Sequence, residues 1–419
     1  MMLFGKFIAK VRGEGRASLN IRVQLLMSQV LGQAILIATI PILTRLLDPE
    51  AMGHYQIALS IALVSLPFAV FQADVLISVA RDSNEVGSLL RRAFRTTLIV
   101  GSVATVTAAL LPSGGGTESA IATTLLLSVM SLTVLTNAVL IRKNDMAKLV
   151  SRNLLGGALV AIAQTVFAML HPTAISLGLG MLVGRAVSQA VLRSGKSYTS
   201  HSNGGVVPKG FWESFSGAGA NTLGTFASQM PMLLVAPIYG PVAAGFLGLG
   251  QRVVGAPTGL IGQAVNQIIV ADASTIIRSG EARLWTGLRS QILTLMIFAL
   301  AAALIIATVM PRLTPMIFGA PWAPAGIYIQ ILALPMCLQL VAIPMAPLMA
   351  MLGMQRTMLI VQLLRILSIA GCILAAGLLS LDMPLTITLI SIAWSLAYFS
   401  TIGLAITGIR RYDAKLEWA

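Results

Sequence analysis

A stripe of small and polar residues recurs at every third or fourth position through one long apolar segment near the middle of the sequence. Its members are Gly248, Arg252, Gly255, Gly259, Gln263 and Asn266. This spacing places them on one face of a helix. A guanidinium group on such a face can bind an anionic ligand through paired hydrogen bonds, and the amides can bind polar groups beside it. Tight helix packing through the glycines, with Arg252 turned outward or paired structurally, is the alternative.

Amide and hydroxyl side chains line two further expected helix faces. The first apolar segment carries Arg22, Gln29 and Gln33, and the seventh carries Ser214, Asn221, Thr225 and Gln229. The lining of a polar cavity and hydrogen bonding between helices both explain such faces. Because these two segments correspond to each other in the internal repeat described below, we favour the cavity.

Asp74 is the one carboxylate well inside an expected span. It is a candidate site for coupling to protons or sodium, because an ionisable residue in a bilayer marks a functional path by default. A structural partner for an intramembrane arginine is the alternative. Arg185 and Arg365 lie about seven residues from the ends of their spans, and their long side chains are expected to reach the interface.

The sequence carries no set of residues that indicates catalysis, a metal or a cofactor. His54, His171 and His201 are far apart. Residues 190–197 resemble a phosphate loop, but they lack the first glycine of the motif and follow no strand, so we interpret them as the basic end of a span. An enzyme, a metal site and a cofactor are therefore not expected.

The elements that carry these faces must be membrane-spanning helices. Of the 419 residues, 57% are hydrophobic and 10% are charged, whereas soluble domains carry about 25% charged residues. This composition excludes a soluble enzyme. Because a span needs about 20 apolar residues in a helix, there is room for about twelve. The apolar windows lie at 23–46, 55–80, 96–112, 119–141, 149–170, 173–192, 213–237, 242–270, 287–310, 322–352, 357–379 and 384–408.

The basic residues predict an orientation. Of the 28 Lys and Arg residues, 23 lie in the two tails and in alternate loops, two (Arg45 and Arg312) lie on the other side, and three lie inside spans. Loops rich in Lys and Arg stay cytoplasmic, so both termini are expected in the cytoplasm. The net charge of +14 reflects this asymmetry, and we expect no nucleic-acid partner.

An internal repeat divides the chain into two halves. Residues 48–53 read Asp-Pro-Glu-Ala-Met-Gly, and residues 240–245, six spans later, read Gly-Pro-Val-Ala-Ala-Gly. Six is an even number of spans, so the halves have parallel orientations and are expected to enclose a central cavity. We therefore expect an all-α integral membrane fold with about 12 transmembrane helices. It comprises an N-terminal six-helix half with a basic tail (1–192), a cytoplasmic linker (193–212) and a C-terminal six-helix half with a short basic tail (213–419).

The residues around the repeat resemble a known family. Residues 41–53, which begin Pro-Ile-Leu-Thr-Arg-Leu-Leu-Asp-Pro, and residues 239–246 and 251–257 are similar to segments of the O-antigen and exopolysaccharide flippases. These form the polysaccharide transporter branch of the multidrug/oligosaccharidyl-lipid/polysaccharide exporter superfamily. That superfamily also contains multidrug and toxic-compound extrusion transporters and peptidoglycan-precursor flippases. The flippases of the branch typically have twelve spans.

The resemblance implies a multi-pass protein of the bacterial inner membrane that moves a polyprenyl-diphosphate-linked oligosaccharide to the periplasmic leaflet for surface polysaccharide biosynthesis. The implied partners are this substrate, membrane lipids, a polysaccharide polymerase and a co-polymerase. In this interpretation, Arg252, Arg22 and Arg45 bind the diphosphate. The sugar chain contacts the amide and hydroxyl faces, which comprise Gln29, Gln33, Asn221, Thr225, Gln229, Gln263 and Asn266.

Other functions remain open. A cation-coupled multidrug or metabolite antiporter of the same superfamily needs a coupling acid, for which Asp74 is the candidate. Members of the family often carry a basic residue and an acid late in the second span, but this chain has Gln72 and Asp74 there, so no charge-pair role is transferred. A non-transporting scaffold fits poorly with paired halves, and the major facilitator signature is missing between the second and third spans.

Overall fold

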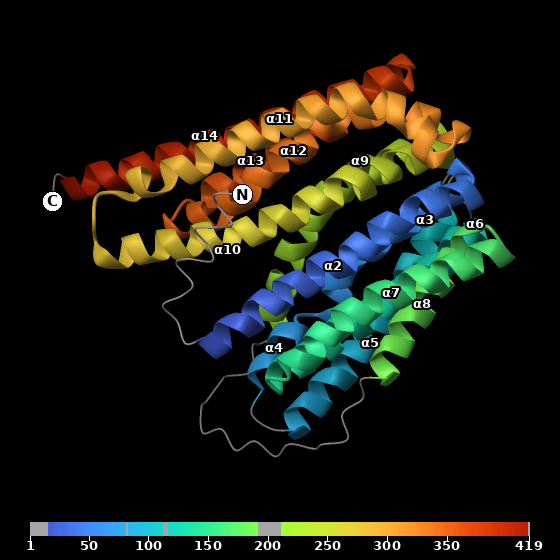
Figure 1. Ribbon diagram of the computed structural model, residues 1–419, viewed down its shortest axis with the longest axis horizontal. Helices are drawn as coiled ribbons and strands as arrows, with labels where there is room; N and C mark the ends of the chain where they lie inside the picture. Colours follow the sequence, from blue (N-terminus) through green and yellow to red (C-terminus); the bar gives the residue numbers. More distant parts are fainter. Residues whose placement is uncertain (1–15, 81–82, 112–115, 192–210, 418–419) are drawn as a thin grey trace. The chain divides into compact units, whose positions relative to one another are not determined.

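The computed structural model describes residues 16–80, 83–111, 116–191 and 211–417, and every regular element in these ranges is a helix (Figure 1). The expected all-α fold is confirmed. The elements are α2 (Arg16–Leu46), α3 (Pro49–Val70), α4 (Ala73–Val79), α5 (Ser83–Leu110), α6 (Gly116–Arg142), α7 (Met146–Leu170), α8 (Ala174–Val191), α9 (Phe211–Gly250), η2 (Gln251–Gly255), α10 (Ala256–Ser279), α11 (Leu284–Phe318), η3 (Ala320–Trp322), α12 (Ala323–Met351), α13 (Gln355–Leu379) and α14 (Met383–Glu417).

Eleven helical stretches among the described residues are long and apolar enough to cross a membrane. The longest, Thr222–Ser279, has 58 residues and is interrupted at Gly240, whose φ of 83° and ψ of 175° are not helical. A span needs about 20 residues, so this stretch is long enough for two of the expected spans, 213–237 and 242–270. Since the interruption falls between them, the structure agrees with about twelve crossings.

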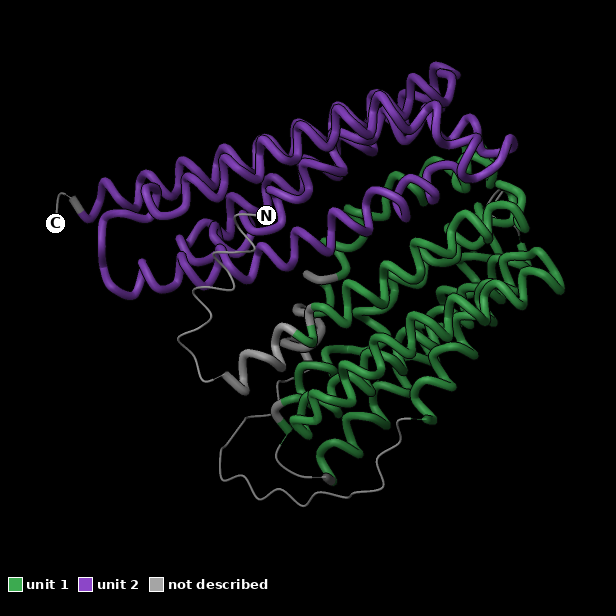
Figure 2. Tube along the Cα trace, in the orientation of Figure 1, with its two compact units in different colours: residues 1–245 green, residues 246–419 purple. Residues whose placement is uncertain are grey.

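Two compact units divide the chain: unit 1, residues 1–245, and unit 2, residues 246–419 (Figure 2). In unit 1, α7 packs against α2 and α8, and α6 packs against α3, α4, α5 and α8. In unit 2, α12 packs against α10, α11 and α14. Most of the expected linker at 193–212 lies outside the described residues. The division into six-helix halves on either side of it stays a prediction.

The second expected span, 55–80, is broken in the structure. α3 ends at Val70, Phe71 and Gln72 take left-handed φ values of 50° and 58°, and α4 then starts at Ala73. Left-handed backbone costs a residue with a Cβ atom about 1–2 kcal/mol. The surrounding helices must therefore stabilise the break.

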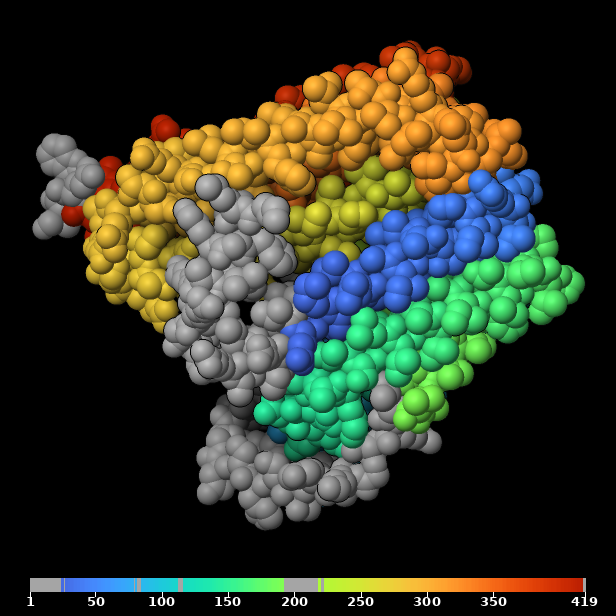
Figure 3. Space-filling view, viewed as in Figure 1, coloured from blue at the N-terminus to red at the C-terminus, as the bar shows by residue number. Residues whose placement is uncertain are grey.

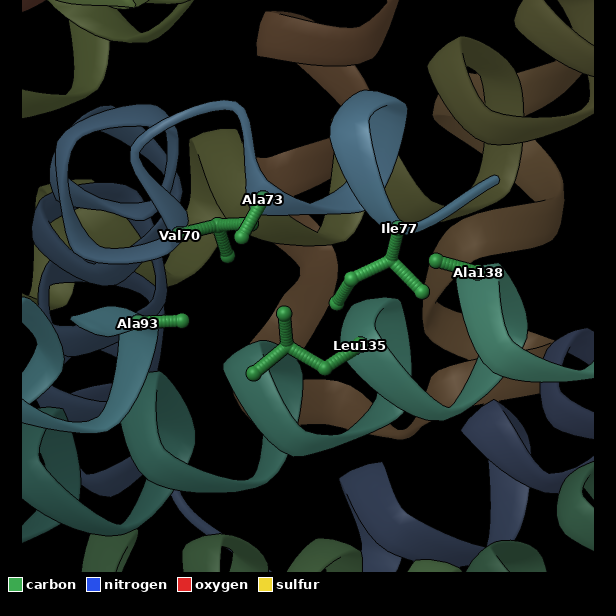
Figure 4. Close-up of a cluster of buried hydrophobic side chains, with 6 residues drawn as sticks. All are labelled: Val70, Ala73, Ile77, Ala93, Leu135 and Ala138. Carbon is green, nitrogen blue, oxygen red and sulfur yellow. The ribbon is translucent and has the colours of Figure 1, made fainter. Parts of the chain in front are cut away.

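Hydrogen bonds from two neighbouring helices hold α4 in place. Thr96 of α5 donates a hydrogen bond of 2.7 Å to the Ala69 carbonyl, in the last turn of α3. Arg142 of α6 donates one of 3.0 Å to the Ala80 carbonyl, at the end of α4. Both bonds satisfy acceptors near helix ends, which would otherwise lack partners. Figure 4 shows the buried apolar side chains that join α4 to α3, α5 and α6: Val70, Ala73, Ile77, Ala93, Leu135 and Ala138.

The two copies of the repeated Pro-x-x-x-Gly segment lie against each other in unit 1. A Cβ atom at Gly53 would overlap the carbonyl oxygen of Pro241 and lie 3.1 Å from the amide nitrogen of Gly245. Reciprocally, a Cβ atom at Gly245 would overlap the carbonyl oxygen of Pro49 and lie 3.3 Å from the amide nitrogen of Gly53. Such reciprocity is what a twofold relation between the copies produces. Backbones at this separation leave room for glycine alone.

Several helices carry large apolar side chains on their outer surface. Leu110 of α5, Met316 of α11 and Leu378 of α13 are 76%, 73% and 75% exposed. A soluble monomer rarely exposes extended apolar surface, whereas a helix that spans a bilayer must present such side chains to the lipid tails. These faces therefore agree with a multi-pass membrane protein.

Asp413 near the end of α14 caps the first turn of α11. Its two carboxylate oxygens accept hydrogen bonds of 2.8 Å from the amides of Leu284 and Trp285. We expect Asp413→Ala to lower the free energy of unfolding by about 1–2 kcal/mol, because it removes a helix cap. Asp413→Asn should lower the free energy of unfolding by less. Thermal unfolding of the purified protein in detergent measures this. Lys415→Ala, an exposed neighbour, is the control, and equal stability of Asp413→Ala and the wild type would contradict the capping role.

Candidate functional site

The polar stripe passes from the end of α9, which carries Gly248, into a π-helical turn of unit 2. Residues 251–255 form η2, in which the amide of Ala256 donates to the carbonyl of Gln251. Pro257 explains this turn, because it has no N–H and its ring collides with the carbonyl four residues earlier in an α-helix. Single π-turns occur frequently at functional sites. The turn carries Arg252, whose side chain is half-buried.

Two glycines of the stripe, Gly255 and Gly259, do not pack closely against another helix of unit 2. A Cβ atom at Gly259 would meet no described atom of the unit within 4 Å, and one at Gly255 would lie 3.9 Å from Gln251 of the same helical stretch. By contrast, a Cβ atom at Gly262, beside the stripe, would lie 2.7 Å from Cδ1 of Ile343 in α12. Gly262 therefore packs closely against α12 within this unit, whereas Gly255 and Gly259 do not.

Two amides continue the stripe along α10. Gln263 is exposed and Asn266 is half-buried. The side-chain oxygen of Asn266 is buried and has no hydrogen-bond donor among the described residues. An unsatisfied buried acceptor costs about 1–3 kcal/mol, so a ligand hydroxyl that donates to it would be stabilising. Asn266 follows Arg252 by fourteen residues, about 21 Å along the helix axis.

In unit 1, one predicted site residue of α9 makes a hydrogen bond between helices. The Ser60 hydroxyl of α3 donates to the side-chain oxygen of Gln229 at 2.9 Å. For this amide, the structure shows helix–helix bonding, which is one of the two interpretations that the sequence allows. Thr225, one turn earlier, is half-buried. The side chain of Asn221, predicted on the same face, lies outside the described residues.

The predicted site residues of α2 are spread along its length. Gln29 is exposed, Gln33 is half-buried, and Arg45 is exposed in the last turn. The side chain of Arg22 lies outside the described residues. Arg22 and Arg45 are separated by 23 residues, about 35 Å along the axis. A single diphosphate can therefore contact one of these arginines but not both.

Asp74 lies in the first turn of α4, directly after the break, and its side chain is half-buried. Within the ranges that the structure describes, the ion pairs involve other acids, namely Glu50, Asp145 and Glu281. The interpretation of Asp74 as the structural partner of an arginine therefore finds no support there. Its role in ion coupling stays a prediction.

Arg365, which the sequence places at the interface, is buried in unit 2. It is 6% exposed, and its Cζ atom lies 5.8 Å from the centre of the Tyr398 ring. Such a cation–π contact stabilises a guanidinium group away from water. The expected snorkelling is wrong for this residue, because an aromatic side chain of α14 accommodates its charge inside the unit.

Sequence reasoning missed a basic pocket of about 490 Å³ beside the break in unit 1. Arg92 stacks over Phe71 there, with its Cζ atom 4.5 Å from the ring centre. The expected span 96–112 leaves the arginines of this pocket in the preceding loop, whereas they lie in α5. Ser83 and Glu85, a favourable first residue and an acid in the first turn, indicate this early helix start. The pocket is lined by Phe71, Ser88, Arg91, Arg92, Arg95 and Thr96.

Two further ionisable residues, which lie near the ends of expected spans, are inside helices. Arg152 is 2% exposed in α7, and Asp272 of α10 accepts a hydrogen bond of 2.9 Å from Gln291 of α11. The sequence holds a signal for each. Asp145 is a favourable cap before α7, and Gly280, with a φ of 66°, terminates α10 beyond the end of the apolar window.

Solved transporter structures share this fold. The chain is similar to the inward-facing conformation of a multidrug resistance MATE family transporter of the MOP superfamily, with a TM-score of 0.70 and 13% sequence identity. The alignment covers 94% of this chain and 99% of that chain. It is also similar to the lipid II flippase MurJ in an inward closed conformation, with a TM-score of 0.62 and 13% sequence identity. This alignment covers 96% of this chain and 91% of that chain. A MOP superfamily transporter from Pyrococcus furiosus matches with a TM-score of 0.52 and 14% sequence identity to this chain, over 95% of this chain and 96% of that chain.

The family follows from the sequence itself. No curated protein sequence matches the chain. The model of the family described as "Polysaccharide biosynthesis protein" matches residues 42–326. This range covers more than half of the 419 residues and includes both copies of the repeated segment and the whole polar stripe. The chain is therefore a multi-pass membrane protein that belongs to the polysaccharide biosynthesis protein family.

Proposed function

We propose that this protein is a flippase that moves polyprenyl-diphosphate-linked oligosaccharides from the cytoplasmic to the periplasmic leaflet of the bacterial inner membrane. It serves the biosynthesis of O-antigen, capsule or exopolysaccharide, works by alternating access and is a transporter, not an enzyme. The observation that carries the proposal is the polar stripe whose arginine, Arg252, lies in a π-turn, in a chain of the polysaccharide biosynthesis family.

The stripe suits a substrate that has a charged end and an uncharged sugar chain. A guanidinium group binds a phosphate through two parallel charge-assisted hydrogen bonds, which is the role of Arg252. Gln263 and the side-chain oxygen of Asn266, which has no partner among the described residues, hydrogen-bond sugar hydroxyls farther along α10. In unit 1, Gln33 and Thr225 are half-buried, and their contact with the sugar chain stays a prediction from the sequence. The lipid tail needs no polar path and can stay in the bilayer.

The charge distribution supports the orientation of this transport. Because 23 of the 28 basic residues are predicted on one side of the membrane, both termini are expected in the cytoplasm. Substrate is then loaded at the basic side of the membrane, where a diphosphate is attracted electrostatically. A polysaccharide polymerase and a co-polymerase would use the product on the opposite side.

A cation-coupled antiporter of drugs or metabolites is the second candidate. One observation favours it: Asp74 is half-buried directly after a break in a membrane helix, without an ion pair in the described ranges. A carboxylate in such a position can take up a proton or a sodium ion during transport. The two candidates require different substrates, so one strain comparison distinguishes them.

The test compares a strain that lacks the gene with the same strain carrying the gene on a plasmid. Surface polysaccharide and the pool of lipid-linked oligosaccharide on the cytoplasmic side are measured in both. Loss of polymer together with accumulation of precursor, both reversed by the plasmid, is the result expected for the flippase. Unchanged polysaccharide with increased sensitivity to cationic drugs would overturn the proposal in favour of the antiporter.

A further inference from the structure

Two arginines of unit 1 lie together between α7 and α8. Arg152 of α7 is 2% exposed, and Arg185 of α8 is half-buried. Gly156 follows Arg152 by one helical turn, and a Cβ atom placed there would lie 2.7 Å from an Nη atom of Arg185 and 3.4 Å from the hydroxyl of Ser188. The Arg185 guanidinium group therefore lies against α7 one turn from Arg152, where two positive charges repel each other.

Close backbone contacts fix the helices around this pair. A Cβ atom at Gly184 would lie 2.6 Å from the amide nitrogen of Val160, so α7 and α8 approach very closely. A Cβ atom at Gly157 would lie 2.8 Å from the Cα atom of Gly32 on the other side of α7. α2 and α7 accordingly lie side by side in the space-filling view (Figure 3). The arginines therefore occupy a rigid site.

The polar atoms of the site lack partners within the described part of the chain. Nε and Nη1 of Arg152, Nε of Arg185 and the hydroxyl of Ser188 are all buried without a hydrogen-bond partner there. No carboxylate pairs with either arginine in that part. Because a buried charge is costly unless it is paired and hydrogen-bonded, two adjacent cations need an anion.

The depth of the pair indicates the kind of anion. Asp145 caps the start of α7, and the hydrogen bond from the Lys148 side chain holds the pKa of Asp145 below its usual value. Arg152 lies six residues after Met146, the first residue of α7, and Arg185 lies six residues before the last residue of α8. Both are about 9 Å inside the ends of helices long and apolar enough to cross a membrane, so we expect them near the level of lipid phosphates.

We infer that Arg152, Arg185 and Ser188 form a buried binding site for the phosphate group of an anionic ligand. Guanidinium groups donate two parallel hydrogen bonds to phosphate oxygens, and the Ser188 hydroxyl can donate another. The anion removes the repulsion between the arginines and satisfies their free N–H groups. This inference does not depend on the proposed transport function, because the site does not involve the stripe at Arg252.

The test measures the thermal unfolding midpoint of the full-length protein in a zwitterionic detergent. Pyrophosphate is added in one series, at an ionic strength matched with chloride, and phosphatidylglycerol is added in a second. Arg185→Gln is the variant, and Arg356→Gln, which removes the same charge from an exposed position, is the control. A response to pyrophosphate identifies the phosphate itself as the ligand, and a response to phosphatidylglycerol alone identifies a lipid headgroup.

The expected result has two parts. Without the anion, Arg185→Gln unfolds at the same temperature as the wild type or higher, because a repulsion is removed. With the anion, the midpoint of the wild type and of the control rises, while the apparent affinity of Arg185→Gln is weaker by at least about tenfold. Absence of a rise in the wild type in both series, or an equal rise in Arg185→Gln, would overturn the inference.

Discussion

Replacing Arg252 with alanine is expected to abolish export of surface polysaccharide while leaving the amount of protein in the membrane unchanged. The side chain is half-buried at the π-turn, and we propose that it binds the diphosphate. Loss of two hydrogen bonds to a charged group costs about 3 kcal/mol, which is about a hundredfold in substrate affinity. Complementation of the deletion strain, with surface polysaccharide quantified against the protein level, measures the effect.

Two control variants make this prediction specific. Arg252→Lys keeps the positive charge but loses the planar fork of donors, so export should fall only partly. Arg356→Gln removes one exposed positive charge and should export normally. Normal export by Arg252→Ala would contradict the assigned role. A drop in its protein level would indicate that the side chain serves folding.

The helices could be predicted from the sequence, because a bilayer allows a chain few kinds of secondary structure. Apolar segments of about 20 residues must form helices there, and the windows predicted from hydropathy correspond to helices in the described ranges. The repeat was detectable as well: residues 48–53 and 240–245 share a few small residues, and the structure shows why. Gly53 and Gly245 lie where the two copies contact each other.

The break after α3 could not be predicted, because the residues that form it carry no local signal. Phe71 and Gln72 adopt left-handed backbone although neither residue type favours it. What stabilises the break is remote in sequence: the Thr96 hydroxyl binds a carbonyl of the last turn of α3, and Arg92 lies over the Phe71 ring. Long-range contacts of this kind are not encoded in a local pattern.

The candidate site was only partly predictable for a similar reason. Spacing alone placed Arg252 and the amides of α10 on one face. It could not tell whether an amide lines a cavity or binds another helix, and Gln229 binds Ser60 of α3. Arg152 stands at the start of the expected span 149–170 and counts among the 23 basic residues of the cytoplasmic side, whereas packing of α7 between α2 and α8 buries it.

The contact between the repeated segments predicts the largest effect on stability. We expect Gly53→Ala and Gly245→Ala each to lower the free energy of unfolding by about 3 kcal/mol, at the upper end of the usual cost of overpacking. In each case the new methyl group would overlap a backbone carbonyl of the other copy, which cannot move aside as a side chain can. Thermal unfolding of the purified protein and its level in the membrane measure the loss.

A matched control and a double variant complete the test. Gly101→Ala places a methyl group at an ordinary distance of 3.9 Å from Leu127, and it should leave stability unchanged or raise it, because alanine favours helix over glycine by about 1 kcal/mol. If the first substitution separates the two segments, the second methyl group overlaps the backbone less. The double variant Gly53→Ala with Gly245→Ala should therefore lose less stability than the sum of the losses in the two single variants. Fully additive losses would contradict a shared contact and would assign each glycine to a separate structural role.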